Sequence, residues 1–194
     1  MRRVDDYVVS GLIAAGGLAS VMFFRRITVY PVAVALLLPA TAAIVYALLR
    51  TVGKRSAPRH VQGPIALIGS HVVAFIVGVH VLTVCNLAGV AWARALGPRA
   101  AVVLLGAVIV AIGNALPRLR PNLALGIRTT KSLDDTCLWS RVHRRAGHGA
   151  VALGCITCVA GLSLHGDLIG PGISVAAIAL VVSIALAYRR YVHD

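Results

Sequence analysis

Apolar residues fall into blocks about twenty residues long, and this pattern constrains the fold of the chain more than any other feature. A helix of that length crosses a hydrocarbon core ~30 Å thick. Apolar residues make up 59% of the sequence and charged residues only 13%, whereas a soluble domain carries about 25% charged residues. The sequence therefore predicts an all-α membrane protein rather than a soluble domain.

Six apolar blocks have a length suited to a membrane span, at residues 8–24, 29–49, 65–90, 100–116, 149–164 and 172–187. The first block ends in Phe23-Phe24-Arg25-Arg26, which does not supply the small-residue cleavage site of a signal peptide. We expect a short connection containing Arg94, Gly97, Pro98 and Arg99 between the third and fourth blocks. The prediction is a bundle of about six transmembrane helices that forms a single integral membrane domain over residues 1–194.

The distribution of charge predicts the orientation of these helices. The chain has 19 Lys and Arg against six acidic residues, a net charge of +13. If the N-terminus is inside the cell, the inside connections hold all of these cations except Arg25, Arg26, Arg94 and Arg99. The positive-inside rule then predicts a multi-pass plasma membrane protein with its C-terminus and residues 118–148 in the cytoplasm. Because the cations lie between apolar blocks, we expect them to meet anionic lipid headgroups, with no direct binding of nucleic acid.

Residues 113–148, which we call the signature loop, contain the one long polar stretch of the chain. Pro117 and Pro121 are expected to hold the chain extended where it leaves the membrane. Ser132 and Asp135 have the spacing of a capping box, with Ser132 as the N-cap. Apolar residues then recur at helical spacing at positions 138, 139, 142 and 146. This pattern predicts an amphipathic helix at the membrane surface, with Trp139 as an interfacial anchor.

The signature loop resembles the motif of the SdpI family of multipass bacterial membrane proteins. The matching residues are Gly113, Asn114, Leu116, Pro117, Arg118, Arg120, Pro121, Asn122, Gly126, Ile127, Arg128, Thr129, Leu133, Trp139, His143, Arg144 and Gly147. The segment Thr130-Lys131-Ser132 and Val142 depart from the motif, which bears on ligand or partner specificity more than on fold. The resemblance implies an immunity or signal-transducing protein, because the best-known member protects its host against an exported peptide toxin and holds a transcriptional repressor at the membrane. The partners implied are a peptide toxin and a cytoplasmic repressor.

The polar residues of the signature loop are the candidate binding site for a ligand or partner: Asn114, Arg118, Arg120, Asn122, Gly126, Arg128, Trp139, His143 and Arg144. An arginine fork grips phosphate or carboxylate through paired hydrogen bonds. The alternative is that these cations only set topology and contact lipid. His143 has two readings of equal weight, an acid–base group or pH sensor and a structural donor that holds the loop to the bundle.

A membrane enzyme or carrier that grips an anionic lipid-linked substrate through this loop is the alternative function, and a structural membrane subunit is a third. The sequence has no nucleophile elbow, phosphate loop or zinc-ligand cluster, so we expect no metal or cofactor and no assigned catalytic residue. No predicted span contains an acidic residue, which argues against an ion-coupled pump. His71 and His80 are expected to make one interhelical hydrogen bond each, and Cys155 and Cys158 to be small residues at helix contacts.

Overall fold

The computed structural model describes residues 2–27, 31–56, 59–123 and 125–163, together with separate positions between 174 and 189. The described residues form six α-helices and no strand. The helices are α1 (Arg2–Phe23), α2 (Pro31–Ser56), α3 (Arg59–Leu87), α4 (Ala91–Ala115), α5 (Thr130–Asp134) and α6 (Thr136–Ser163). Short 3-10 turns follow α1 and α4, η1 (Phe24–Arg26) and η2 (Leu116–Arg118). The predicted all-α membrane-type fold is confirmed.

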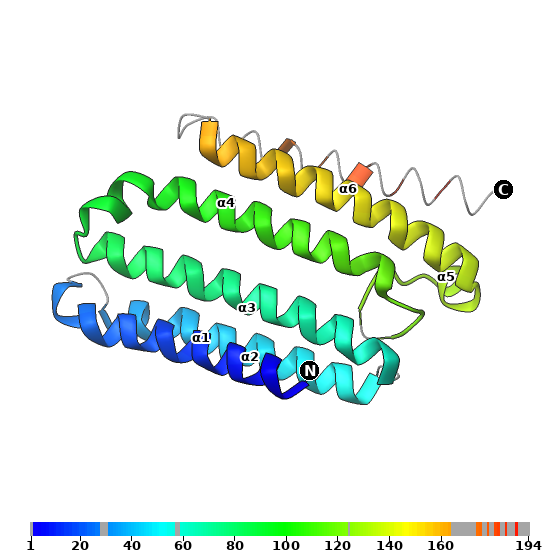
Figure 1. The fold of residues 1–194 in the computed structure, drawn as a ribbon, viewed down its shortest axis with the longest axis horizontal. Helices are drawn as coiled ribbons and strands as arrows, with labels where there is room; N and C mark the ends of the chain where they lie inside the picture. Colours follow the sequence, from blue (N-terminus) through cyan, green and yellow to red (C-terminus); the bar gives the residue numbers. More distant parts are fainter. Residues whose placement is uncertain are drawn as a thin grey trace.

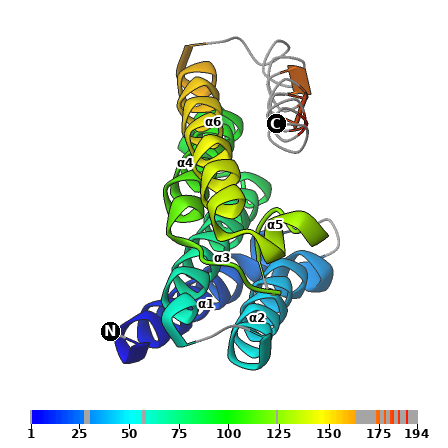
Figure 2. The ribbon, with the colours of Figure 1, turned by 90° about the vertical axis from the view of Figure 1, so that its right-hand side faces the viewer.

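The long helices lie side by side with α3 in a central position (Figure 1). Helices α1 and α2 pack on one side of α3, α4 packs on the other side, and α6 packs on the far side of α4. The end view shows the same order (Figure 2). The short helix α5 and the segment before it lie at one end of the bundle, beside the start of α6. This end carries the signature loop.

Four described helices are long and apolar enough to cross a membrane, at Tyr7–Arg26, Gly63–Leu87, Ala91–Arg118 and Thr136–Ser163. They contain or overlap the first, third, fourth and fifth predicted spans. The second predicted span lies on α2, where the described apolar stretch is the shorter Ala35–Thr51. Most of the sixth predicted span, at residues 172–187, lies outside the described residues.

The connection between α3 and α4 is shorter than the sequence predicted. Gly89 adopts a positive φ of 81°, and the backbone N–H groups of Gly89 and Val90 donate to Asn86 O and Cys85 O, both at 3.0 Å. This pair of bonds is a Schellman motif, which ends a helix where glycine supplies the left-handed residue. Helix α4 therefore begins at Ala91, and the predicted connecting residues 94–99 lie inside it, with Pro98 near its start.

The signature loop also differs from the prediction, because its amphipathic helix is not a separate surface element. Thr129, not Ser132, is the N-cap of α5, and Ser132 is the third helical residue of the same capping box. Asp135 then caps α6, its Oδ1 accepting from Cys137 N at 2.7 Å and Leu138 N at 3.1 Å. Helix α6 continues without interruption into the fifth predicted span and is described as far as Ser163.

Candidate functional site

The first turns of α6 direct one buried face toward the rest of the bundle. Leu138, Trp139, Val142 and Ala146 are all buried, which confirms the predicted apolar face. His143 shares this face and is fully buried. Trp139 was predicted to be an interfacial anchor, and this is wrong, because only 1% of its surface is exposed. The apolar stripe faces protein because the described residues 119–123 and 125–129, which we call the folded-back segment, lie over it.

Trp139 and His143 lie one helical turn apart and together hold this folded-back segment. Their rings stack with centroids 4.0 Å apart and an interplanar angle of 18°. Trp139 Nε1 donates to Leu119 O at 2.8 Å, and Ile127 N donates to His143 Nε2 at 3.0 Å. Two side chains one turn apart on α6 thereby hold the segment at two points, Leu119 and Ile127, which are eight residues apart.

The hydrogen bonds of His143 define its protonation state in this arrangement. A backbone N–H can only donate, so His143 Nε2 must carry the lone pair that accepts from Ile127. His143 Nδ1 lies 2.9 Å from Trp139 O, which can only accept, so Nδ1 carries the proton. The ring is neutral and both nitrogens are satisfied. Of the two readings of His143, this geometry favours the structural one.

Gly126 makes room for the stacked rings. Its φ is +124°, a backbone conformation that side-chain-bearing residues rarely adopt. A Cβ at this position would overlap His143 Nε2 and lie 3.1 Å from two ring carbons of Trp139. Glycine is therefore required here for both its backbone conformation and its lack of a side chain.

Two further side chains shape the segment from inside. Asn122 is buried, and its amide donates to Arg120 O at 2.7 Å and accepts from Leu125 N at 2.8 Å. Ser132 is also fully buried, and its Oγ lies 3.1 Å from both Ile127 O and Thr129 O. The sequence analysis listed Asn122 as a candidate binding residue. It assigned Ser132 as an N-cap and did not predict its contact with the loop. Both side chains hydrogen-bond to the loop's own backbone, and ligand binding by Asn122 stays a prediction.

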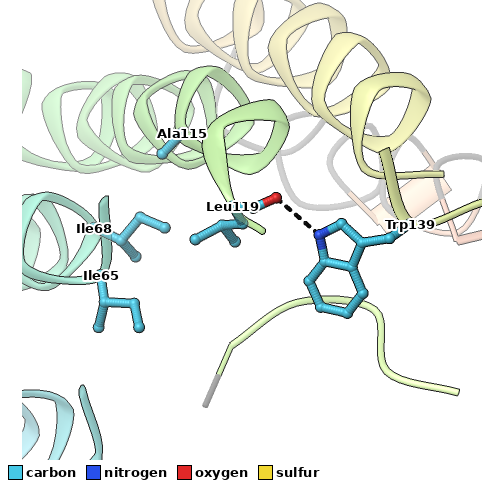
Figure 3. Packing of buried hydrophobic residues seen from close by; sticks show 5 residues of the cluster. All are labelled: Ile65, Ile68, Ala115, Leu119 and Trp139. Atoms are coloured by element: carbon cyan, nitrogen blue, oxygen red, sulfur yellow. Dashed lines mark hydrogen bonds between the residues drawn. The ribbon is translucent and has the colours of Figure 1, made fainter. Parts of the chain in front are cut away.

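The apolar side of the segment packs against three helices. Leu119 and Trp139 lie in one buried cluster with Ile65 and Ile68 of α3 and Ala115 of α4 (Figure 3). The indole hydrogen bond to Leu119 O crosses the edge of this cluster. The segment is therefore a packed part of the bundle.

Comparison with known proteins gives a family match for part of the chain. Residues 118–188 match the model of the SdpI/YfhL protein family. Over this region the chain is SdpI-like. No curated protein and no solved structure gave a match. The matched region of this SdpI-like chain includes the folded-back segment, α5 and α6, which supports the resemblance drawn from the signature loop.

The remaining predicted site residues of the SdpI-like loop point outward. Asn114, Arg118, Arg120, Arg128 and Arg144 are all exposed. Arg128 Nη1 donates to Leu123 O, so its guanidinium is held against the loop. The candidate site thus divides into an internal set, Asn122, Gly126, Trp139 and His143, and an exposed set made of Asn114 and the four arginines. Ligand or partner binding by either set stays a prediction.

Sequence reasoning missed the close contact of α4 and α6 in the SdpI-like chain. A Cβ at Gly106 would lie 2.6 Å from Gly154 O, and a Cβ at Gly154 would lie 2.6 Å from Gly106 O. One heptad along, Gly113 and Gly147 meet in the same way. The sequence does contain a pattern that could have predicted this contact. Each helix has two glycines seven residues apart, and this spacing places both glycines on one face of the helix.

The intramembrane polar residues have separate roles. His80 is fully buried, and its Nε2 lies 2.7 Å from Ser20 Oγ of α1, which confirms an interhelical bond. His71 Nδ1 instead contacts Leu67 O of its own helix at 2.7 Å, so the interhelical prediction is wrong there. Cys158 packs against Gly106 as predicted, whereas Cys155 is exposed. The described residues contain no group of three side chains able to hold a metal ion.

Proposed function

We propose that this SdpI-like membrane protein is an immunity or signal-transducing protein whose signature loop captures or releases a cytoplasmic regulator. A membrane-active peptide toxin, at the outer side or within the bilayer, is the proposed ligand. It acts by binding one arrangement of the bundle better than another, since only differential affinity shifts an equilibrium. The loop and the C-terminus face the cytoplasm, as the excess of cations in those connections favours.

One observation carries the proposal: side chains of a membrane helix hold the folded-back segment at Leu119 and Ile127. Trp139 and His143 belong to α6, which continues without interruption into its membrane-spanning part. That part meets α4 through direct backbone contact at paired glycines. A shift of α6 along α4 would therefore displace both loop contacts at once. A ligand that acts within the membrane could change the loop in this way.

The exposed cations form the proposed surface for the regulator. Arg118, Arg120 and Arg144 are exposed, and guanidinium groups suit acidic side chains because their donors match a carboxylate in pairs. The internal residues position this surface and do not touch the regulator. This division predicts two classes of variant. Substitution of an exposed cation removes part of the binding surface, whereas substitution of an internal residue disturbs the conformation of the loop.

A deletion strain challenged with membrane-active peptide toxins tests the proposal. Wild-type protein should restore survival, and Arg144→Ala should fail to do so at equal membrane abundance. Arg99→Ala is the matched control, because Arg99 is an exposed cation in the first half of α4, away from the signature loop. Full rescue by Arg144→Ala combined with Arg120→Ala would contradict the proposed surface.

Reporter fusions test the proposed orientation. A reporter enzyme that works only in the cytoplasm should be active when it is fused after Asp134. Activity of a reporter that works only outside the cell would overturn the orientation.

The geometry gives the alternative, an enzyme or carrier for an anionic lipid-linked substrate, less support. Acid–base catalysis needs a group free to take up or release a proton. His143 uses both ring nitrogens in hydrogen bonds to the backbone, and Asp135 caps α6. Substrate-dependent turnover by purified protein, lost in Arg128→Ala with the fold retained, would reverse this preference.

A further inference from the structure

The tip of the folded-back segment combines an apolar side chain and a tethered cation. Asn122 closes a tight turn through its bonds to Arg120 O and Leu125 N, and this turn leaves the Leu123 side chain 64% exposed. Arg128 returns from the other side of the turn and donates to Leu123 O. The guanidinium has five N–H donors and is itself exposed, so donors remain for a second acceptor beside the exposed leucine.

The position of this tip relative to the membrane can be inferred from the helix residues against which the segment packs. Leu119, just before the tip, lies in one buried cluster with Ile65 and Ile68 (Figure 3), and Leu125, just after it, packs against the same cluster. Ile65 and Ile68 lie within the candidate span Gly63–Leu87. A helix rises ~1.5 Å per residue, so these contacts lie roughly 3–8 Å inside the start of that span. The segment therefore packs at the loop end of a candidate membrane span, the end at which the hydrocarbon core would meet the headgroups. An exposed leucine at this level has acyl chains and glycerol beside it.

We infer that Leu123 and Arg128 form a lipid anchor that binds the phosphate of an anionic phospholipid. Leu123 enters the acyl–glycerol boundary, and the Arg128 guanidinium donates to the phosphodiester oxygens just above it. This is the usual arrangement of apolar and cationic groups at a membrane interface. The strongly basic signature loop adds attraction for anionic headgroups over zwitterionic ones. The inference depends only on the membrane location of the helices and not on the proposed function.

Site-directed spin labelling in nanodiscs tests the position of Leu123. The label is attached at Leu123→Cys. The two exposed native cysteines are first removed by Cys137→Ser and Cys155→Ala, so that they are not labelled. Leu162→Cys supplies the lipid benchmark, because Leu162 is exposed on the membrane-spanning part of α6. Asp134→Cys supplies the aqueous benchmark, because Asp134 is exposed at the end of α5. Collisions with oxygen report lipid, and collisions with a water-soluble nickel complex report water.

The anchor predicts that the label at 123 resembles the label at 162, with several-fold higher oxygen-to-nickel accessibility than the label at 134. A label at 123 that matches the aqueous benchmark would overturn the inference. A label shielded from both reagents would also overturn it, because a protein partner or a second copy of the chain would then cover the tip. The melting temperature of each labelled protein verifies that the fold is intact.

The phosphate contact has its own measurement. In nanodiscs containing phosphatidylglycerol, Arg128→Gln should raise nickel accessibility at 123, and native mass spectrometry should show about one fewer retained phosphatidylglycerol. Arg128→Lys keeps the charge but not the fork, so it should restore the retained lipid only in part. In pure phosphatidylcholine, Arg128→Gln should have a much smaller effect. Equal lipid retention by wild type and Arg128→Gln would overturn the assignment of Arg128.

Discussion

Gly113 and Gly147 bring the backbones of α4 and α6 into direct contact. A Cβ at Gly113 would lie 2.8 Å from Gly147 O, and a Cβ at Gly147 would lie 2.7 Å from Gly113 O. Gly147 lies one turn beyond His143 on the same helix. The glycine contact therefore determines where the start of α6 sits against the end of α4, and with it where the two loop contacts lie.

The glycine contact predicts that Gly113→Ala destabilises the bundle. Overpacking a tight contact costs about 1–3 kcal/mol, which exceeds the ~1 kcal/mol that alanine gains over glycine in a helix. Gly97→Ala is the matched control on the same helix, because no neighbour lies within 4 Å of its added Cβ. Thermal unfolding in mild detergent should show a lower midpoint for Gly113→Ala and an equal or higher one for Gly97→Ala. Equal midpoints for both variants would mean that the helices are not in backbone contact.

The indole hydrogen bond can be tested without emptying the core. Trp139→Phe keeps an aromatic ring but removes the donor to Leu119 O, and leaving this buried acceptor unpaired should cost about 1–3 kcal/mol. Trp92→Phe is the control, because Trp92 is about half exposed and should change stability little. The measurement is the free energy of unfolding of each variant in the same detergent. A loss no greater than that of the control would show that the indole bond contributes nothing.

His143→Ala should release the loop by removing the acceptor of Ile127 N–H. The unpaired amide costs about 1–3 kcal/mol if it stays buried, so the segment should open instead. Hydrogen exchange at Ile127 should then become faster, whereas Arg144→Ala should leave it unchanged, since Arg144 is exposed. In wild-type protein, ¹⁵N NMR should report the neutral, Nδ1-protonated ring. Slow exchange at Ile127 in His143→Ala would contradict the role assigned to His143.

The membrane helices could be predicted because they depend on local composition. Runs of apolar residues define a span whatever their neighbours are, and Pro117 lies in the turn that follows α4. The ends of helices were harder to predict where an apolar run and a helix-ending glycine indicate different limits. Gly89 ends α3 before the predicted limit, because the Schellman bonds at this glycine outweigh the apolar run that continues past it.

The site was predicted only in part, because its contacts join residues far apart in the chain. Helical spacing gave the buried face of α6, but nothing local to Trp139 shows that Leu119 O will accept its N–H. Without that partner an amphipathic tryptophan belongs at the membrane interface. The capping box failed for a related reason, since Thr129 and Ser132 carry equivalent hydroxyls and only the fold of the preceding segment selects Thr129 as the cap.

The buried pair of Ser20 and His80 supports a last prediction, in the membrane-spanning half opposite the loop. Ser20 Oγ contacts His80 Nε2 at 2.7 Å and Ala35 O at 3.1 Å, so it joins α1 to both α3 and α2. Ser20→Ala should destabilise the bundle by about 0.6 kcal/mol, the mean measured for hydrogen bonds between membrane helices, and by no more than the measured maximum of about 1.7 kcal/mol. Ser70→Ala is the control, because Ser70 Oγ bonds only within its own helix among the described residues.

A double variant separates the hydrogen bond from simple packing. Among the described residues His80 Nδ1 is buried with no partner, so Ser20→Ala removes the side-chain partner of an imidazole that is already only partly satisfied. An apolar ring has no such requirement. In the Ser20→Ala background, His80→Phe should therefore recover part of the lost stability, although it destabilises the protein on its own. Additive losses in the unfolding free energies of the two variants would show that Ser20 and His80 contribute independently.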